Sequence, residues 1–246
     1  MNGITVCVDY SDLLALTLPY NRHHFKEFVV VTSLTDEKTV QVAQENQAKV
    51  FQTNAFYEDG AAFNKYKALE QGLDFLGRSG LLCIMDADVL WPKHIPDFNY
   101  LKGNLYTPYR RMLRYVTLPL PQESDWNAIP YHGYMREFAG YTQIFHADDP
   151  HLGDKTPWHE IDWAHAGGGD SFFQLRWPEE CKIRPPFECL HLGEDGTNWA
   201  GRVSPYVDGT RHSEYRKHNE ALKVFLYGRA NYPPENRFAG EKIKPQ

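Results

Sequence analysis

The chain has 246 residues, a formal net charge of −6 and a sequence pI of about 6.0, and it is 42% apolar, 24% charged and 14% aromatic. This length suits one sizeable hydrophobic core or two small ones, and the apolar and charged fractions are ordinary for a globular protein. The negative charge argues against a protein whose whole surface binds nucleic acid, because such binding needs a basic face.

Strand and helix patterns alternate along the first 90 residues. Strand-like apolar runs cover residues 4–10, 27–33, 49–53 and 81–85. The first helical pattern begins after Ser11, an expected N-cap, and is expected to end at Pro19. A capping box from Ser33 to Asp36 predicts the second helix, and apolar spacing predicts a third over 61–76.

This alternation predicts parallel β-α-β units and an α/β fold whose mainly parallel sheet carries helices on both faces. Ligands in such sheets bind beyond the carboxyl ends of the strands. Polar residues at those ends are therefore candidate site residues, and they are Asp9, Tyr10, Thr32, Ser33, Thr53, Asp86 and Asp88.

Beyond residue 92 the pattern is less regular. Strand-like stretches cover 106–122, 140–147 and 187–193, and a glycine-rich turn enters a helical pattern over 167–177. The polar stretch from about residue 230 predicts a tail on the surface.

The cysteines and the N-terminus indicate a cellular compartment. Cys7, Cys83, Cys181 and Cys189 are scattered without a paired spacing, which is typical of reduced thiols rather than of a disulfide frame or a zinc site. The N-terminus lacks the pattern of a secretory signal, and no apolar run is long enough to span a bilayer. We therefore expect a cytoplasmic protein without a membrane span.

Two carboxylates follow the buried run 81–85, at Asp86 and Asp88. Two desolvated carboxylates repel each other, and a hard divalent cation such as Mg²⁺ or Mn²⁺ relieves that repulsion. The alternative is that both acids cap the next turn or pair with Lys93. Position alone leaves both interpretations open.

Three further features bear on this choice, and each has a purely structural alternative. Asn64 and Lys65 stand at a helix start, where they could hold a phosphate or belong to an ordinary amphipathic helix. Asp170 follows three glycines, as a base facing a crevice or as a simple N-cap. His191 ends a strand-like run, as a third metal ligand or as a hydrogen-bonded core histidine.

Taken in order, these motifs resemble the nucleotide-sugar glycosyltransferases of GT-A fold. The layout is similar to that of family-2-like enzymes and, more closely, to that of the β-1,4-galactosyltransferases. The motifs that carry the resemblance are Phe63-Asn64-Lys65, Asp86-Ala87-Asp88, the run GGGDS with Asp170, and His191 in HLG, spread over about residues 4 to 202.

The resemblance implies a single Rossmann-like GT-A domain over residues 1–246. It implies a nucleotide-sugar-binding half over about 1–100, an acceptor-binding and catalytic half over about 101–229, and a surface tail over about 230–246. Asp88 and His191 would bind the metal with help from Asp86, and Asp170 would be the general base. The expected nucleotide-sugar-binding residues are Asp9, Tyr10, Thr32, Ser33, Asp36, Asn64, Lys65, Asp86 and Ala87. The expected acceptor-binding residues are Trp163, Gly168, Gly169, Arg110 and Trp199.

The motifs depart from the family pattern at three points. Gly169 stands where the family has a glutamate, and Ala166 or Gly167 stands where it has a tryptophan. Lys65 replaces an arginine and so loses bidentate geometry.

The resemblance therefore implies metal-dependent transfer, with Mn²⁺ or Mg²⁺, from a nucleotide-diphosphate sugar, by family custom a UDP-sugar. The acceptor would be a hydroxyl of a glycan, a small molecule or modified DNA, with inversion at the sugar and no obligate protein partner. The loop 146–169 is expected to be a mobile lid or a wall of the acceptor site.

Two alternatives stay open. The arginines Arg110, Arg111 and Arg114 could contact DNA phosphates, as in a phage-type enzyme that glycosylates a hydroxymethylated base. A non-catalytic sugar- or nucleotide-binding module would keep the aromatic surfaces without needing Asp88, Asp170 and His191 together. A sugar nucleotidyltransferase is disfavoured, because no glycine-rich phosphate loop follows the first strand.

Overall fold

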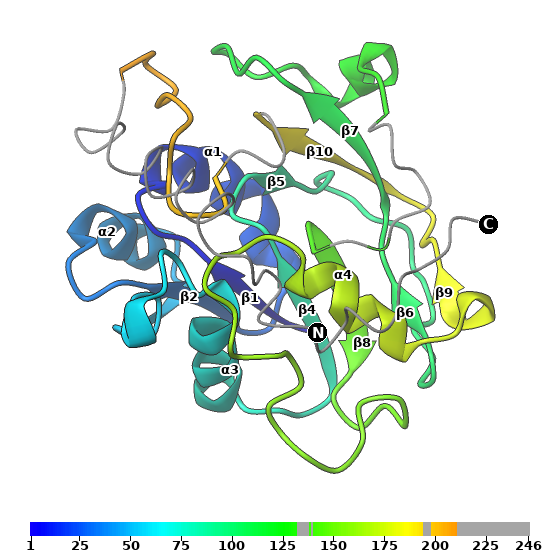
Figure 1. The fold of residues 1–246 in the computed structure, drawn as a ribbon. Helices are drawn as coiled ribbons and strands as arrows, with labels where there is room; N and C mark the ends of the chain where they lie inside the picture. The colour runs from blue at the N-terminus through cyan, green and yellow to red at the C-terminus, as the bar shows by residue number, and fades with distance from the viewer. Residues whose placement is uncertain (132–137, 139, 194–197, 211–246) are drawn as a thin grey trace, which may run out of the picture.

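A computed structural model describes residues 1–131, 138, 140–193 and 198–210. Its main sheet has seven strands in the order β3-β2-β1-β4-β8-β6-β9 (Figure 1). These strands are β1 (Asn2–Val6), β2 (Phe28–Thr32), β3 (Lys49–Gln52), β4 (Leu81–Met85), β6 (Leu105–Tyr106), β8 (Thr142–His146) and β9 (Lys182–Ile183).

The strand directions confirm the predicted α/β fold with a mainly parallel sheet. Strands β3, β2, β1 and β4 pair in parallel. Strand β8 runs antiparallel to β4 and β6, and β6 pairs with β9 in parallel, so β8 alone runs against the rest of this sheet. The ends of β1, β2 and β4 therefore share one edge.

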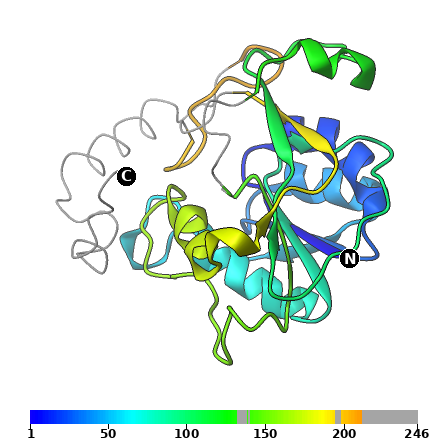
Figure 2. The ribbon, with the colours of Figure 1, turned by 90° about the vertical axis from the view of Figure 1, so that its right-hand side faces the viewer.

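A smaller sheet of β5 (Val89–Leu90), β10 (Glu188–Leu192) and β7 (Tyr109–Leu113) stands beside the main one. Strand β10 pairs antiparallel with β5 and parallel with β7. Figure 2 shows β7 in green and β10 in yellow lying side by side. Because β5 begins one residue after Asp88, this sheet carries β10 directly to the acidic strand end.

Helices cover both faces of the main sheet, as predicted (Figure 1). Helix α1 (Ser11–Asn21) and helix α2 (Glu37–Glu45) pack on one face, and α3 (Lys65–Leu76) packs on the other. The alternating sides of β2 show this division, because Val30 packs with α1 and α2 while Val29 and Val31 pack with α3. A short helix, α4 (Gly169–Phe173), lies on the α3 side.

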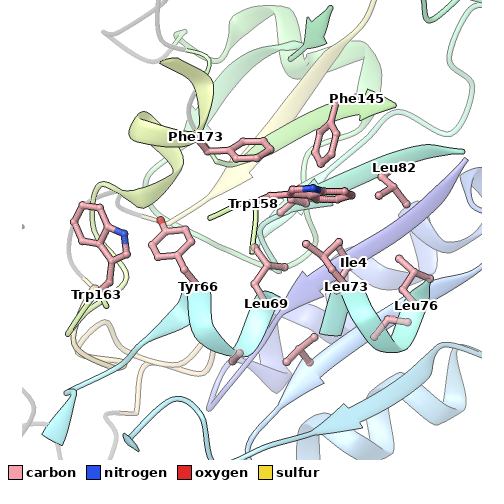
Figure 3. Packing of buried hydrophobic residues seen from close by; sticks show 14 of the residues in the cluster. Ile4, Tyr66, Leu69, Leu73, Leu76, Leu82, Phe145, Trp158, Trp163 and Phe173 are labelled. Atoms are coloured by element: carbon pink, nitrogen blue, oxygen red, sulfur yellow. The ribbon is translucent and has the colours of Figure 1, made fainter. Parts of the chain in front are cut away.

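Figure 3 shows the core on the α3 side. Leu69, Leu73 and Leu76 recur at helical spacing and pack against Ile4 and Leu82 of the sheet. Trp158, Phe145 and Phe173 extend the same core toward α4. The Tyr66 ring belongs to this cluster, and its hydroxyl points toward the glycine turn that precedes α4.

Helix α1 differs from its prediction at both ends. Ser11 is its first residue rather than its N-cap, and Tyr10 precedes it without a side-chain capping bond. Pro19 lies inside the helix, which continues to Asn21. Tertiary hydrogen bonds hold this last turn, because Asn21 Nδ2 donates to the Val89 carbonyl at 2.6 Å and Asn21 Oδ1 accepts from the Trp91 N–H at 2.9 Å.

Helices α2 and α3 begin later than predicted because their caps lie further along the chain. Asp36 is the N-cap of α2 and accepts from the Thr39 N–H at 3.1 Å, so the capping box from Ser33 is wrong. Asn64 is the N-cap of α3 and accepts from the Lys67 N–H at 3.0 Å. The predicted range 61–76 therefore begins too early, whereas the separate prediction of a helix start at Asn64 and Lys65 is confirmed.

The second half also departs from its prediction. The stretch 106–122 is not one strand, because Thr107 and Pro108 separate β6 from β7 and β7 ends at Leu113. Proline has no N–H to donate to a ladder. The helix over 167–177 reduces to α4 and a 3₁₀ turn at Gln174–Arg176. Other 3₁₀ turns lie at Arg22–His24, Glu58–Gly60, Glu123–Ala128 and Glu179–Cys181.

Glu70 of α3 anchors the loop before α4. Its carboxylate accepts from the backbone N–H groups of Trp158 and His159 at 3.0 and 2.9 Å, and from Arg78 at 2.7 Å. The His159 ring lies 2.6 Å from it through Nδ1 and stacks on Phe173 at 4.1 Å between ring centroids. The loop 146–169 is thus held to α3 at Trp158 and His159, which argues against the predicted mobile lid, and the acceptor wall stays a prediction.

Replacing this carboxylate tests the anchor. We expect Glu70→Gln to lower the free energy of unfolding by about 3 kcal/mol, because it breaks the buried ion pair and leaves the exposed Asp74 as the carboxylate partner of Arg78. Burial raises the Glu70 pKa, but His159 and Arg78 outweigh it and hold the pKa below the ordinary value. The ionised carboxylate therefore stabilises the fold at pH values above its unfolded-state pKa. The difference in free energy of unfolding between wild type and Glu70→Gln should become smaller as acid protonates the native carboxylate.

The measurement is urea unfolding of both proteins across pH. Asp74→Asn is the matched control, since Asp74 contacts the same Arg78 through an exposed side chain and should change little. Equal stability of Glu70→Gln and wild type at neutral pH would contradict the anchoring role.

Cys7, Cys83 and Cys189 are buried free thiols, and Cys181 is a half-buried one. Among the described residues, no helix combines the length and the apolar character needed to cross a bilayer. The predicted tail over 230–246 lies outside the described residues, and the single-domain organisation stays a prediction.

Candidate metal and catalytic centre

Asp86, Asp88 and His191 converge where the two sheets meet. Strand β4 ends at Met85, and β5 begins at Val89, whose register partner on β10 is His191. One potential ligand atom from each of the three residues lies within 4.8 Å of the others. The pairing of β5 with β10 explains why residues so far apart in the sequence meet here.

The Asp88 carboxylate is poised for a further partner. His191 Nε2 lies 3.2 Å from Asp88 Oδ1. That oxygen is buried, yet it accepts no hydrogen bond within the described part of the chain. Burial raises the pKa of Asp88, but the adjacent imidazole outweighs it and holds the pKa below the ordinary value. An ionised, buried oxygen without a hydrogen-bond donor is costly unless a ligand satisfies it.

Asp86 differs because it already has a cationic partner. Lys65 Nζ lies 2.5 Å from Asp86 Oδ1. Burial raises the Asp86 pKa, and the charge of Asp88 adds to this rise while Lys65 opposes it. The pKa of Lys65 is raised in turn, since the attraction of Asp86, Asp170 and Asp88 overcomes its burial.

This set of donors fits a divalent cation. Two carboxylates and an imidazole suit Mn²⁺, and two carboxylates also suit Mg²⁺ with its waters and phosphate oxygens. The oxygen without a hydrogen bond belongs to Asp88, whereas the Asp86 carboxylate forms an ion pair with Lys65. The predicted division, in which Asp88 is the direct ligand and Asp86 assists, stays a prediction.

Arg110 borders the centre on the side of β7. Its Nη1 lies 3.1 Å from His191 Nδ1, and its guanidinium lies 4.3 Å from the centroid of the Tyr141 ring. Its neighbour Arg111 is buried and pairs with Glu188 at 2.5 Å, while Arg114 is exposed. The three arginines therefore do not present one common basic patch, which removes the support they gave to DNA binding.

Asp170 lies in the first turn of α4 with its carboxylate held by the backbone. Gly140 N–H donates to Asp170 Oδ2 at 2.6 Å, and the Tyr66 hydroxyl lies 3.3 Å from Oδ1. That hydroxyl also accepts from the Asp170 N–H at 3.0 Å. A Cβ at Gly140 would lie 2.5 Å from the Asp170 Cβ, so this approach requires glycine. Gly140 and Tyr66 are positioning residues that the sequence did not single out.

The three glycines before Asp170 have reasons within the chain itself. A Cβ on Gly167 would lie 2.6 Å from the Trp199 ring, and one on Gly169 would lie 2.3 Å from the Tyr66 ring. Gly168 has φ 94° in the left-handed region. Packing and backbone conformation therefore explain the three glycines without a ligand, and their predicted role in letting the backbone approach a ligand stays a prediction.

The expected nucleoside residues lie together at the ends of β1 and β2. The Asp36 carboxylate accepts from the Asp9 N–H at 2.8 Å and from the Thr39 hydroxyl at 2.6 Å, with Thr32 at 3.3 Å. These bonds occupy the buried carboxylate and hold Asp9 at φ 58°. Asp36 thus shapes the turn, which leaves Asp9 and Tyr10 as the more accessible pair.

Arg202 contacts the expected nucleoside residues Asp9 and Tyr10, and sequence reasoning did not single it out. Its side chain is buried at 1% exposure and forms a bidentate ion pair with Asp12, including a 2.9 Å bond from Nη2. Its guanidinium lies between the Tyr10 and Tyr206 rings, 4.6 and 4.2 Å from their centroids. The segment 198–210 therefore folds back over the turn after β1. A pairing across 190 residues leaves no local signal in the sequence.

The expected acceptor residues separate into two groups. Trp163 is 1% exposed and packs against Tyr66 in the core, so its burial keeps it from a solvent-borne acceptor. Trp199 is 39% exposed and stacks on His165. Gly168 and Gly169 form the turn before Asp170, and Arg110 borders the metal cluster.

Ala87, which was expected to bind the nucleotide-sugar, is buried, and its carbonyl accepts from the Thr17 hydroxyl at 2.6 Å.

No protein-family model and no curated protein matches this sequence. Among solved structures, mannosyl-3-phosphoglycerate synthase from Rubrobacter xylanophilus is similar at 16% identity and a TM-score of 0.39, over 60% of this chain and 53% of that one. The chain thus spans about half the length of that enzyme.

Two mycobacterial structures show similarity over more of the chain. Glucosyl-3-phosphoglycerate synthase from Mycobacterium tuberculosis, in complex with Mn²⁺, UDP and glucosyl-3-phosphoglycerate, has 11% identity and a TM-score of 0.46, over 78% of this chain and 70% of that one. A structure described only as a mycobacterial protein has 12% identity and a TM-score of 0.46, over 91% and 73%. At these values the functional assignment must come from the centre itself.

Proposed function

We propose that the protein is a metal-dependent glycosyltransferase of GT-A type that transfers a sugar from a nucleotide diphosphate to an acceptor hydroxyl. The observation that carries this proposal is the convergence of Asp86, Asp88 and His191, with a buried Asp88 oxygen that lacks a hydrogen-bond donor. The proposed domain is the single GT-A unit predicted from the sequence, in a cytoplasmic protein.

Donor binding would divide between two neighbouring surfaces. Asp88 and His191, with Asp86, would hold Mn²⁺ or Mg²⁺, which as a Lewis acid neutralises charge on the leaving diphosphate. Asp9 and Tyr10 would contact the nucleoside, which we propose to be uridine. The charges of Asp88 and Asp86 both raise the Tyr10 pKa, after burial, which supports adjacency of the two surfaces.

Asp170 would act as the general base. Its carboxylate is aimed by Gly140 and Tyr66, and its charge reaches Lys65, which pairs with Asp86. Asp170 would take the proton as the acceptor oxygen forms its bond to the anomeric carbon, while the bond to the diphosphate breaks and its electron pair leaves with the phosphate. We propose inversion from the family resemblance, and for that outcome one base suffices without a covalent nucleophile.

The layout of these residues supports the β-1,4-galactosyltransferase-like order of motifs as the working model. Acceptor contacts are proposed from Trp199, Gly168 and Arg110, which lie near Asp170 or the metal cluster. The proposed acceptor is a hydroxyl of a glycan, a small molecule or modified DNA. Water must be kept from the donor, and the anchored loop 146–169 is the proposed wall.

A thermal-shift and hydrolysis panel tests this function. We expect one UDP-sugar to raise the melting temperature only when Mn²⁺ or Mg²⁺ is present. The same UDP-sugar should be slowly hydrolysed when no acceptor is added. GDP-sugars and the free sugars are the controls. Stabilisation by a sugar or nucleotide without metal, and without turnover, would favour a binding module. Labelling of hydroxymethylated DNA by a UDP-sugar would favour the DNA-modifying alternative.

A further inference from the structure

The contact between Arg110 and His191 bears on how the cluster accepts a metal. Arg110 Nη1 lies 3.1 Å from His191 Nδ1 in hydrogen-bond geometry. A guanidinium has N–H donors and no acceptor, so Nδ1 must be the acceptor in this pair. In the neutral imidazole the proton then lies on Nε2, which is 3.2 Å from Asp88 Oδ1 but is not aligned to donate a hydrogen bond to it.

This tautomer cannot bind a metal through either ring nitrogen as it stands. Coordination through Nε2 uses the lone pair of that nitrogen and moves the proton to Nδ1, where Arg110 offers no acceptor. Coordination through Nδ1 places the ion where the Arg110 nitrogen now lies. Either route therefore requires the guanidinium to leave Nδ1.

The surroundings hold Arg110 in this place. Its guanidinium lies over the Tyr141 ring, and that ring also stacks on the His191 imidazole with centroids 6.5 Å apart. Arg110 and His191 come from β7 and β10, which are register neighbours in the small sheet. The positive charge of Arg110 beside the cluster adds a repulsion toward any cation.

We propose that Arg110 is a positioning residue that opposes metal loading, because it and the metal compete for His191. Metal binding in this centre is thereby coupled to displacement of the Arg110 side chain. This inference rests on the proposed function, since it takes Asp86, Asp88 and His191 as the metal ligands.

The test is the affinity for Mn²⁺ alone, measured on the full chain by calorimetry and by electron paramagnetic resonance of the free ion. We expect Arg110→Gln to bind Mn²⁺ about 10-fold more tightly than wild type, because the glutamine carbonyl can accept Nδ1–H when Nε2 binds the metal. Arg110→Met removes the charge without supplying an acceptor, so its affinity should lie between the two. Arg114→Gln, which removes an exposed charge further along the same segment, is the matched control and should match wild type.

A second readout uses no metal. Nitrogen NMR of the imidazoles, with His191→Phe to identify the signals, should show His191 protonated on Nε2 in the metal-free wild type. A proton on Nδ1 there, or Mn²⁺ affinity that Asp88→Asn abolishes but Arg110→Gln leaves unchanged, would overturn the inference alone. An absence of saturable Mn²⁺ binding in wild type and Arg110→Gln would overturn the proposed metal centre as well.

Discussion

Asp88→Asn is expected to lower the rate of metal-dependent sugar transfer by about 10³-fold, equivalent to about 4 kcal/mol of transition-state stabilisation. The substitution keeps the side-chain shape but removes the ionised oxygen that lies beside His191 without a hydrogen-bond donor. The loss should appear in kcat/KM, measured with radiolabelled donor over a range of Mn²⁺ concentrations. Saturating metal should restore only part of it.

Two controls separate this loss from unfolding. Asp97→Asn changes an exposed acid a few residues further along the chain and should leave activity unchanged. Circular dichroism should show a folded Asp88→Asn protein, although its stability should fall somewhat, since the lowered Asp88 pKa means that the ionised carboxylate stabilises the fold at neutral pH. Wild-type turnover by folded Asp88→Asn would contradict the assignment. Retained donor affinity in a protein that never turns over would favour the binding module.

Asp170→Asn is expected to lower kcat by 10²- to 10⁴-fold, the usual contribution of a positioned general base. Asparagine can still accept the Gly140 N–H bond through its carbonyl, so the turn before α4 should keep its geometry. Donor affinity should change little, because the proposed role of Asp170 is toward the acceptor and it is not one of the three clustered metal-ligand candidates. Steady-state kinetics together with calorimetry of donor binding measure both quantities.

The control for Asp170 is again Asp97→Asn, an exposed acid outside the loop 146–169. A large loss of donor affinity in Asp170→Asn, with kcat unchanged, would show that Asp170 serves the donor and would remove it as the base. The rate of donor hydrolysis in the absence of acceptor is a further test of the role of Asp170. If water reaches the sugar by another route, Asp170→Asn should lower this rate less than it lowers the rate of sugar transfer.

The strand-and-helix order of the first half could be predicted because its signals are local. Residues 81–85 form β4 with the predicted bounds, since apolar β-formers run unbroken until the first aspartate. The start of α3 at Asn64 also follows from a local cap. Pro19 misled the prediction for α1, because the bonds of Asn21 to Val89 and Trp91 that hold its last turn are tertiary.

The site was predictable where it depends on strand ends and not where it depends on distant pairing. Asp86 and Asp88 follow from their place after a buried strand. His191 was expected beside them through the family resemblance and not from spacing, because its approach depends on β5 pairing with β10, and a two-residue strand has no recognisable pattern. Gly140, Tyr66 and Arg202 contact site residues 30 to 193 positions away, so no spacing rule could indicate them.

The central claim is that Asp88 and His191 hold a divalent metal that a nucleotide-diphosphate sugar shares. The most direct measurement is anomalous diffraction, at the manganese absorption edge, from crystals of the protein grown with Mn²⁺ and UDP. We expect one strong peak within bonding distance of an Asp88 oxygen and a His191 nitrogen, with diphosphate oxygens completing the coordination. Bound UDP with no manganese at this cluster, or manganese held elsewhere in the chain, would contradict it.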